Sequence, residues 1–191
     1  MTLTLHGSDG VTFPDAVGGA MDGADVAAGK SWVSLQTQTA SSSASVNFTT
    51  ASAFDGTYNT LVFTMTNIVP ATNAQTLEMR ISVDGGSNYL SGSDYNDGWA
   101  GAGQTSSTIL GTTGSASSEG ACGVVYVFDP TSTAVDKLFL VVGAALDGTA
   151  WAQNNRAAYQ GTLAAVTAIQ FFFASGNIAS GVFTMYGISK T

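Results

Sequence analysis

Alternation of apolar and polar residues is the feature of this sequence that most limits its fold. In the clearest stretch, from Leu77 to Val83, every second residue is apolar. Because successive side chains of a β-strand point to opposite sides, Leu77, Met79, Ile81 and Val83 would share one face. The Asp-Gly-Gly at 84–86 then supplies turn residues. The sequence therefore predicts a half-buried strand that ends at this turn.

The same period of two, or a high content of β-branched and aromatic residues, favours strands elsewhere. We predict them at 31–37, 45–49, 60–68, 108–110, 123–128, 137–144, 156–159, 169–174 and 182–189. One segment, 162–166, has helix-forming residues but is too short to stand alone. Residues 92–120 are rich in Gly, Ser and Thr and are expected to form long loops around 108–110. Many short strands between turns predict an all-β, jelly-roll-like antiparallel β-sandwich over residues 31–191.

Two of these segments, 124–128 and 138–142, are apolar at consecutive positions. This pattern indicates central strands, or strands covered by a neighbouring subunit. Cys122 lies just before the first run, so we expect a buried thiol. As the only cysteine, it excludes an internal disulfide and offers no metal-binding framework.

The first thirty residues follow neither the helical nor the strand period. They are rich in Gly, Ala and Asp, which favour irregular backbone. We predict that residues 1–30 form an extended attachment arm that orders against a partner, with a reach on the order of 100 Å. A plain flexible terminus is the alternative. The apolar contacts of the arm would come from Leu3, Leu5, Val11, Phe13 and Pro14.

Charged side chains are scarce, at 9% of the chain, with 5 Lys and Arg against 13 Asp and Glu and a net charge of −8. An ordinary soluble domain carries roughly 25%. Five basic residues cannot form a nucleic-acid-binding patch. No signal peptide is recognisable, and no apolar run approaches the roughly 20 residues that span a membrane. Sparse charge lowers the cost of burying strand faces between copies, so the composition favours an assembly component.

Residues suited to catalysis are few. His6 is the only histidine and falls in the arm, whereas triad chemistry needs a base held rigidly beside a nucleophile. Glu78 and Glu119 are the only glutamates, and Glu78 shares the polar face of its strand with Arg80. We therefore predict no enzymatic activity, no catalytic residues and no cofactor.

Three aspartates are candidate metal ligands: Asp84, Asp94 and Asp97 fall in neighbouring segments with Asn88 and Asn96 nearby. Calcium takes six to eight oxygen ligands from loops of this kind. The spacing matches no calcium loop, however, and Asp-Gly is a common turn dipeptide. The preferred interpretation is therefore turn formation, without a metal.

Three aromatic residues, Tyr89, Tyr95 and Trp99, occupy the same loop-rich region. Aromatic faces beside amides and carboxylates suit a glycan, whose C–H faces stack while its hydroxyls hydrogen-bond. The alternative is that these rings fill the core or a subunit contact.

Three groups of motifs have a familiar arrangement. They are the opening segment 3–15, the segments 38–48, 67–72 and 83–87 in the body, and 175–187 near the end. These stretches resemble small structural proteins of tailed bacteriophages, of the fibre, appendage or capsid-decoration type. The chain departs from the opening motif at His6, where Asn is usual, and at Ala16, where Gly is usual. The resemblance implies a β-sandwich head and a structural role, and it supplies no catalytic residues.

The resemblance also implies partners and a location. Virion surface modules commonly form closed homo-oligomers, so we expect a trimer on the virion surface, assembled in the host cytoplasm. The arm would attach it to another virion protein, such as a capsid or tail protein. The alternative is a carbohydrate-binding module, or a receptor-binding tip that recognises a host-surface glycan through Tyr89, Tyr95 and Trp99.

Overall fold

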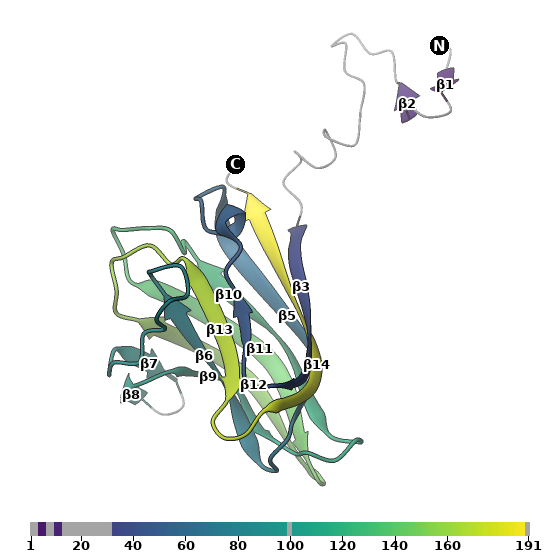
Figure 1. Ribbon diagram of the computed structural model, residues 1–191, viewed down its shortest axis with the longest axis vertical. Helices are drawn as coiled ribbons and strands as arrows, with labels where there is room; N and C mark the ends of the chain where they lie inside the picture. The colour runs from purple at the N-terminus through teal and green to yellow at the C-terminus, as the bar shows by residue number, and fades with distance from the viewer. Residues whose placement is uncertain (1–3, 7–9, 13–31, 99–100, 190–191) are drawn as a thin grey trace.

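The computed structural model describes residues 4–6, 10–12, 32–98 and 101–189 (Figure 1). In this part of the chain, two antiparallel sheets pack as a sandwich and two short strands form a separate hairpin. A single 3₁₀ turn, η1 (Ala51–Ala53), is the helical element of these residues. The predicted all-β antiparallel sandwich is confirmed.

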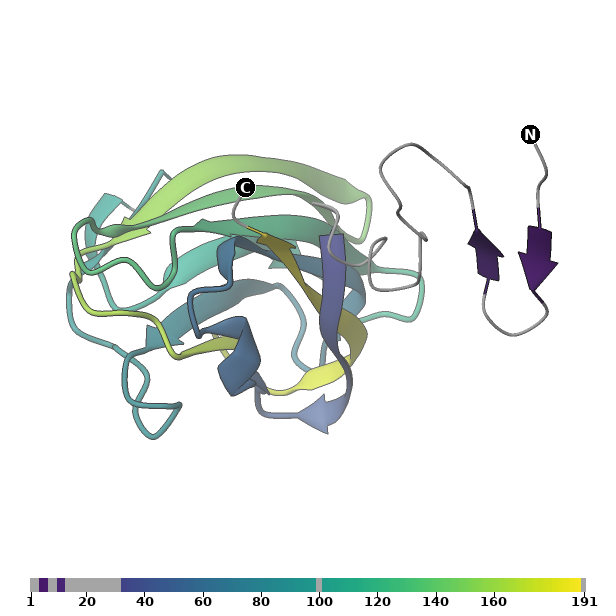
Figure 2. The same cartoon turned by 90° about the horizontal axis from the view of Figure 1, so that it is seen from above.

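The larger sheet has eight strands and the smaller has four. In spatial order the larger contains β3 (Trp32–Ser43), β14 (Ile178–Ser189), β5 (Tyr58–Pro70), β10 (Gly120–Phe128), β11 (Lys137–Asp147), β12 (Ala150–Gln160), β7 (Tyr95–Asp97) and β8 (Gly101–Gln104). The smaller contains β4 (Val46–Phe48), β13 (Ala168–Phe173), β6 (Gln75–Ser82) and β9 (Ser107–Thr113). Figure 2 shows the two sheets as stacked layers.

The chain passes between the sheets in a jelly-roll-like way. It changes sheet from β3 to β4, from β5 to β6 and from β13 to β14. In the large sheet β14 lies between β3 and β5, and in the small sheet β13 lies between β4 and β6. A meander of β10, β11 and β12 extends the larger sheet beyond this wrapped part.

Aromatic side chains fill the space between the sheets. The rings of Phe48 and Phe63 lie 5.2 Å apart, and Phe171 lies 5.3 Å from Phe63 and 5.5 Å from Phe183. Edge-to-face and tilted pairs of this kind add stability beyond the area they bury. The predicted inward face of β6 is confirmed for Leu77, Met79 and Ile81, which are fully buried, whereas Val83 lies beyond the end of the strand and is half-buried.

Every predicted strand segment overlaps an observed strand, but four strands were missed, two in the N-terminal segment and two, β7 and β8, in the Gly-rich segment. β7 pairs with the edge of β12, and β8 pairs with β7. Both lie in the Gly-rich segment that was expected to form loops, because glycine and aspartate have low intrinsic strand preference. The segment 162–166 forms no helix.

The N-terminal segment is described only in part. β1 (Thr4–His6) and β2 (Gly10–Thr12) form an antiparallel hairpin with Leu5 opposite Val11. The other expected contact residues, Leu3, Phe13 and Pro14, lie outside the described residues. The attachment role of the arm therefore stays a prediction.

Candidate interaction surface

The three aspartates that are candidate metal ligands have different surroundings. Asp84 is exposed, and its carboxylate accepts hydrogen bonds from the Asn88 backbone N–H at 2.9 Å, the Asn88 amide at 2.7 Å and the Ser82 hydroxyl at 2.7 Å. These donors, the Asn88 backbone N–H first, lower the pKa of Asp84 to about 2. Asp94 is exposed. No group of three or more His, Cys, Asp or Glu side chains suited to a metal occurs among the described residues.

Asp97 belongs to a buried polar layer beneath the edge of the large sheet. Its Oδ2 accepts the backbone N–H of Thr108 at 3.0 Å. The neighbouring inward-facing residues of β12 include Asn154 and Arg156, which are joined by a 2.6 Å hydrogen bond. Burial lowers the pKa of the Arg156 guanidinium, and the Asp97 carboxylate acts against that shift. This layer ties β7 and β9 to β12.

Of the three aromatic residues proposed for glycan stacking, Tyr95 lies in the core. Tyr95 is fully buried, and its hydroxyl donates to the Leu90 carbonyl at 3.1 Å and accepts the Ile81 N–H at 3.0 Å. Burial raises the pKa of Tyr95 to about 12. Tyr89 is half-buried, and Trp99 lies outside the described residues. Tyr95 therefore offers no ring face to a sugar and acts instead as a core residue, which was the alternative interpretation.

The expectation of a buried thiol at Cys122 is wrong, because this side chain is exposed. Along β10, Ala121, Val125 and Val127 face the core and are buried, so Cys122 lies on the opposite, outward side. A run of apolar residues does not indicate which face of a strand is covered, so the run after Cys122 could not show on which side the thiol lies.

The outward side of the large sheet is apolar over its central strands. Strand pairing places six residues in one row across the sheet, Trp32, Ile188, Thr60, Phe128, Leu138 and Tyr159. The next two rows contain Ser34, Tyr186, Val62, Tyr126, Leu140 and Ala157, and then Thr37, Thr184, Thr64, Val124, Val142 and Asn155. None of these residues is Asp, Glu, Lys or Arg.

We name the apolar centre of these rows the outer patch. It consists of Trp32, Tyr126, Phe128, Leu138, Leu140, Val142, Tyr159 and Tyr186. Five of its side chains are well exposed: Leu138 at 55%, Trp32 at 48%, Val142 at 45%, Phe128 at 41% and Tyr159 at 39%. A contiguous apolar surface of this kind on a folded protein is a candidate interaction site.

Rings of the outer patch are held in place by one another. The Trp32 ring lies 6.2 Å from that of Tyr126, nearly perpendicular at 83°, and 5.8 Å from that of Tyr186. Tyr126 stacks in turn on Phe128 at 6.3 Å. Val62, between the two tyrosines in register, is fully buried although it points outward. The patch is therefore a preformed surface and needs little ordering before it binds.

The outward side of the small sheet is different. Glu78 and Arg80 of β6 lie there, as the alternation predicted. The Arg80 guanidinium carbon is 4.6 Å from the centre of the Phe172 ring, and its Nε donates to the Thr105 carbonyl at 3.0 Å. Charges are thus present on one outer face of the sandwich and absent from the outer patch on the other.

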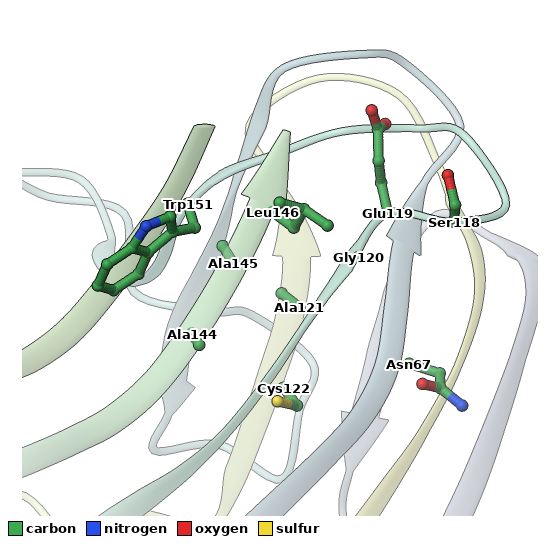
Figure 3. Close-up of a pocket in the computed structure, with 10 residues that line it drawn as sticks. All are labelled: Asn67, Ser118, Glu119, Gly120, Ala121, Cys122, Ala144, Ala145, Leu146 and Trp151. Carbon is green, nitrogen blue, oxygen red and sulfur yellow. The ribbon is translucent and has the colours of Figure 1, made fainter. Parts of the chain in front are cut away.

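A pocket of about 320 Å³ lies at the end of the large sheet where β11 turns into β12. Its lining residues come from β5, β10, β11, β12 and the segment before β10, and Trp151 stands at one side (Figure 3). Trp151 is 74% exposed. Sequence reasoning overlooked it because the expected strand there began only at Arg156, whereas β12 begins at Ala150.

Comparisons with protein families, with curated proteins and with solved structures find no match for this chain. In the part of the chain that the structure describes, no helix has the length and apolar character needed to cross a membrane. The functional inference therefore depends on the surface itself.

Proposed function

We propose that this protein is a non-enzymatic structural component of a tailed-phage virion, and that it assembles as a homo-oligomer through the outer patch. The observation that carries the proposal is the apolar, charge-free outer face of the large sheet. The phage context comes from the sequence motifs at 3–15, 38–48 and 175–187.

Charge favours a second copy as the occupant of the patch. The chain has a net charge of −8, so two copies repel each other wherever carboxylates would meet. Contact through the outer patch places no carboxylate against another and desolvates no ion, which is the main cost of burying charged surface. The same surface carries no basic residue, so it offers nothing specific to an acidic partner.

The area is sufficient for a specific contact. Three residue rows about 6.6 Å apart on six strands about 4.8 Å apart cover roughly 600 Å². Two such surfaces together bury about 1,200 Å², which is at the lower end of stable protein interfaces. In a closed trimer each copy divides this surface between two neighbours, so three copies together bury about 1,800 Å² around the threefold axis, and the trimer is the assembly that we propose.

The mass of the particle in solution tests this proposal. A trimer has three times the chain mass of 19.4 kDa, about 58 kDa, and light scattering after size-exclusion chromatography measures it. Leu138→Asp should shift the population to monomer, because it places a carboxylate in the contact. Leu138→Thr introduces an uncharged, strand-favouring residue and should weaken the oligomer less. Since Leu138 is already 55% exposed, neither change disrupts the core.

Asn47→Asp is the matched control. Asn47 is exposed on β4 of the small sheet, so the added carboxylate lies away from the outer patch and should leave the mass unchanged. A monomeric wild-type protein at all concentrations, or a Leu138→Asp variant that keeps its oligomer, would contradict the proposed contact.

The arm is the proposed link to a capsid or tail protein. Deleting residues 1–30 should leave a folded sandwich, because among the described residues the core cluster comes entirely from β3 onward. The shortened protein should fail to enter particles, and this is measured by its abundance in purified virions. Incorporation at the wild-type level would rule out the attachment role.

A further inference from the structure

We propose that the pocket beside Trp151 is a binding site for a neutral glycan. Its position, lining and electrostatic surroundings each contribute to this inference. The site adjoins the last row of the outer patch, and its assignment does not depend on the proposed virion function.

The pocket combines an aromatic platform with a flat floor. Strand pairing aligns Gly120, Leu146 and Trp151 across β10, β11 and β12. Cys122 and Ala144, which are exposed, complete the floor, whereas Ala121 and Ala145 turn their methyl groups into the core. Figure 3 shows this floor between Trp151 and the opposite rim. Small residues leave room for a ring to lie flat against the sheet, with the exposed indole available to stack against its C–H face.

The opposite rim is polar. Asn67 on β5 and Ser118 in the segment before β10 line that side of the pocket. An amide and a hydroxyl together supply both donors and acceptors, as sugar hydroxyls require. A pocket that is mostly apolar, with a few polar groups at one side, is the usual form of a small-molecule site. The combination of stacking surface and neutral hydrogen-bonding groups matches a carbohydrate.

Glu119 holds the two walls of the pocket together. Its Oε1 accepts the Gly148 N–H at 2.6 Å and its Oε2 accepts the Ala116 N–H at 2.9 Å. The Gly114 N–H also donates to the Leu146 carbonyl at 2.9 Å. These bonds fix the segment before β10 against the β11–β12 turn that precedes Trp151, so the pocket is preorganised.

Electrostatics favour a neutral ligand. The carboxylate of Glu119 lies at the rim, and no Lys or Arg lines the pocket. An acidic sugar would meet like charge without a basic partner, which is costly. We therefore assign the site to hexose or N-acetylhexosamine units, without sialic or uronic acids.

The pocket adjoins the outer patch on the same face of the large sheet. Val142 of the patch and Ala144 of the pocket are two positions apart on β11, which is about 7 Å along the strand. Leu138 and Leu146 are eight positions apart, about 26 Å, so a contact centred on the row of Leu138 leaves Trp151 open to a ligand.

A glycan array that carries both neutral and sialylated oligosaccharides, probed with the full-length protein, tests the assignment. The wild-type protein should bind neutral members and not the sialylated ones. Trp151→Leu should reduce affinity for the best neutral oligosaccharide by about tenfold or more, as loss of one stacked ring implies. Trp151→Tyr retains a stacking ring and should bind within a few-fold of wild type.

The mass of each variant separates this site from the proposed oligomer contact. We expect Trp151→Leu to keep the wild-type mass, whereas Leu138→Asp should lose the oligomer and keep neutral-glycan binding per subunit. Absence of binding to every neutral glycan, or equal binding by Trp151→Leu, overturns the assignment. A Trp151→Leu variant that becomes monomeric also overturns it, because the indole would then belong to a contact between copies.

Discussion

Gly123 and Gly143 face each other across β10 and β11, and together they leave the space that Leu110 of the opposite sheet fills. A Cβ atom added at Gly143 would lie 2.6 Å from the Leu110 Cδ2 and 2.6 Å from the Cys122 carbonyl oxygen. At Gly123 it would lie 2.9 Å from the Val142 carbonyl oxygen. This pair of glycines sets how closely β9 approaches the large sheet.

Replacing Gly143 by alanine should therefore destabilise the fold. The new methyl group overlaps both backbone and a core side chain, and overpacking of this kind costs about 1–3 kcal/mol. Gly161→Ala is the control, since the nearest atom to its added Cβ is 3.7 Å away. Chemical denaturation measures both free energies of unfolding, and equal values for the two variants would contradict the packing role of the glycine pair.

Alkaline pH should reduce stability through Tyr95. Its pKa is about 12 in the folded protein against 10.0 for an unperturbed tyrosine, so the folded state retains a proton that the unfolded state loses. The stabilisation that Tyr95 provides is fully present below pH 10 and is lost as the pH rises toward 12. Over this range the free energy of unfolding should fall by roughly 2–3 kcal/mol. Denaturation of the wild type and of Tyr95→Phe at pH 8 to 11.5 measures it.

The comparison with Tyr95→Phe isolates this residue. The variant should be less stable at pH 8, by about 1–2 kcal/mol, because the Ile81 N–H and the Leu90 carbonyl lose their partner. The difference in free energy of unfolding between the wild type and Tyr95→Phe should then narrow as the pH rises. Burial also lowers the pKa of Lys137. Because Lys137 is present in both proteins, its effect cancels when their free energies of unfolding are subtracted. Tyr159→Phe, at an exposed position, should retain the alkaline loss of the wild type, and a constant deficit for Tyr95→Phe would exclude the mechanism.

Asp97→Asn should cost more stability than Asp94→Asn. Asp97 is 1% exposed and lies beside the buried Arg156 guanidinium, so removing its charge leaves the cation with less compensation. We expect a loss of roughly 1–3 kcal/mol. Asp94, three positions earlier, is exposed, and its amide variant should unfold like the wild type. Thermal unfolding at pH 7 compares them, and the expectation fails if both variants behave alike.

Cys122 should react with a maleimide reagent in the folded protein. The thiol is exposed on β10, so labelling should reach one equivalent without denaturant. The Leu138→Asp variant is the proper sample, because a neighbouring copy bound to the outer patch would be absent from it. Mass spectrometry counts the added label. Labelling that requires denaturant would contradict the exposed position of this thiol.

Alternation predicted the fold well because it reflects burial on one side of a strand. Leu77, Met79 and Ile81 face the core as expected, and Glu78 and Arg80 point outward. The pattern failed where both sides of a strand are apolar. In β10 and β11 the alternation does not distinguish the core side from the side of the outer patch. The prediction that Cys122 faces the core was therefore wrong.

The candidate sites were harder to predict because they depend on residues from distant segments. Trp32 meets Tyr126 and Tyr186 only through strand pairing across the sheet, and nothing local relates these positions. Tyr95 was expected in a loop, yet β7 places its ring in the core. Trp151 becomes noticeable only when β12 is seen to begin at Ala150 and to expose every second residue.

Pairing of Trp32 with Ile188 gives the sandwich a direction-dependent mechanical strength. These residues are at the same end of neighbouring antiparallel strands, so a force that separates β3 from β14 there breaks their hydrogen bonds one after another. A force between this end and the β11–β12 turn instead acts along the strands and loads many bonds at once. The sandwich should therefore resist a load along its strands better than a load that peels β3 away from β14.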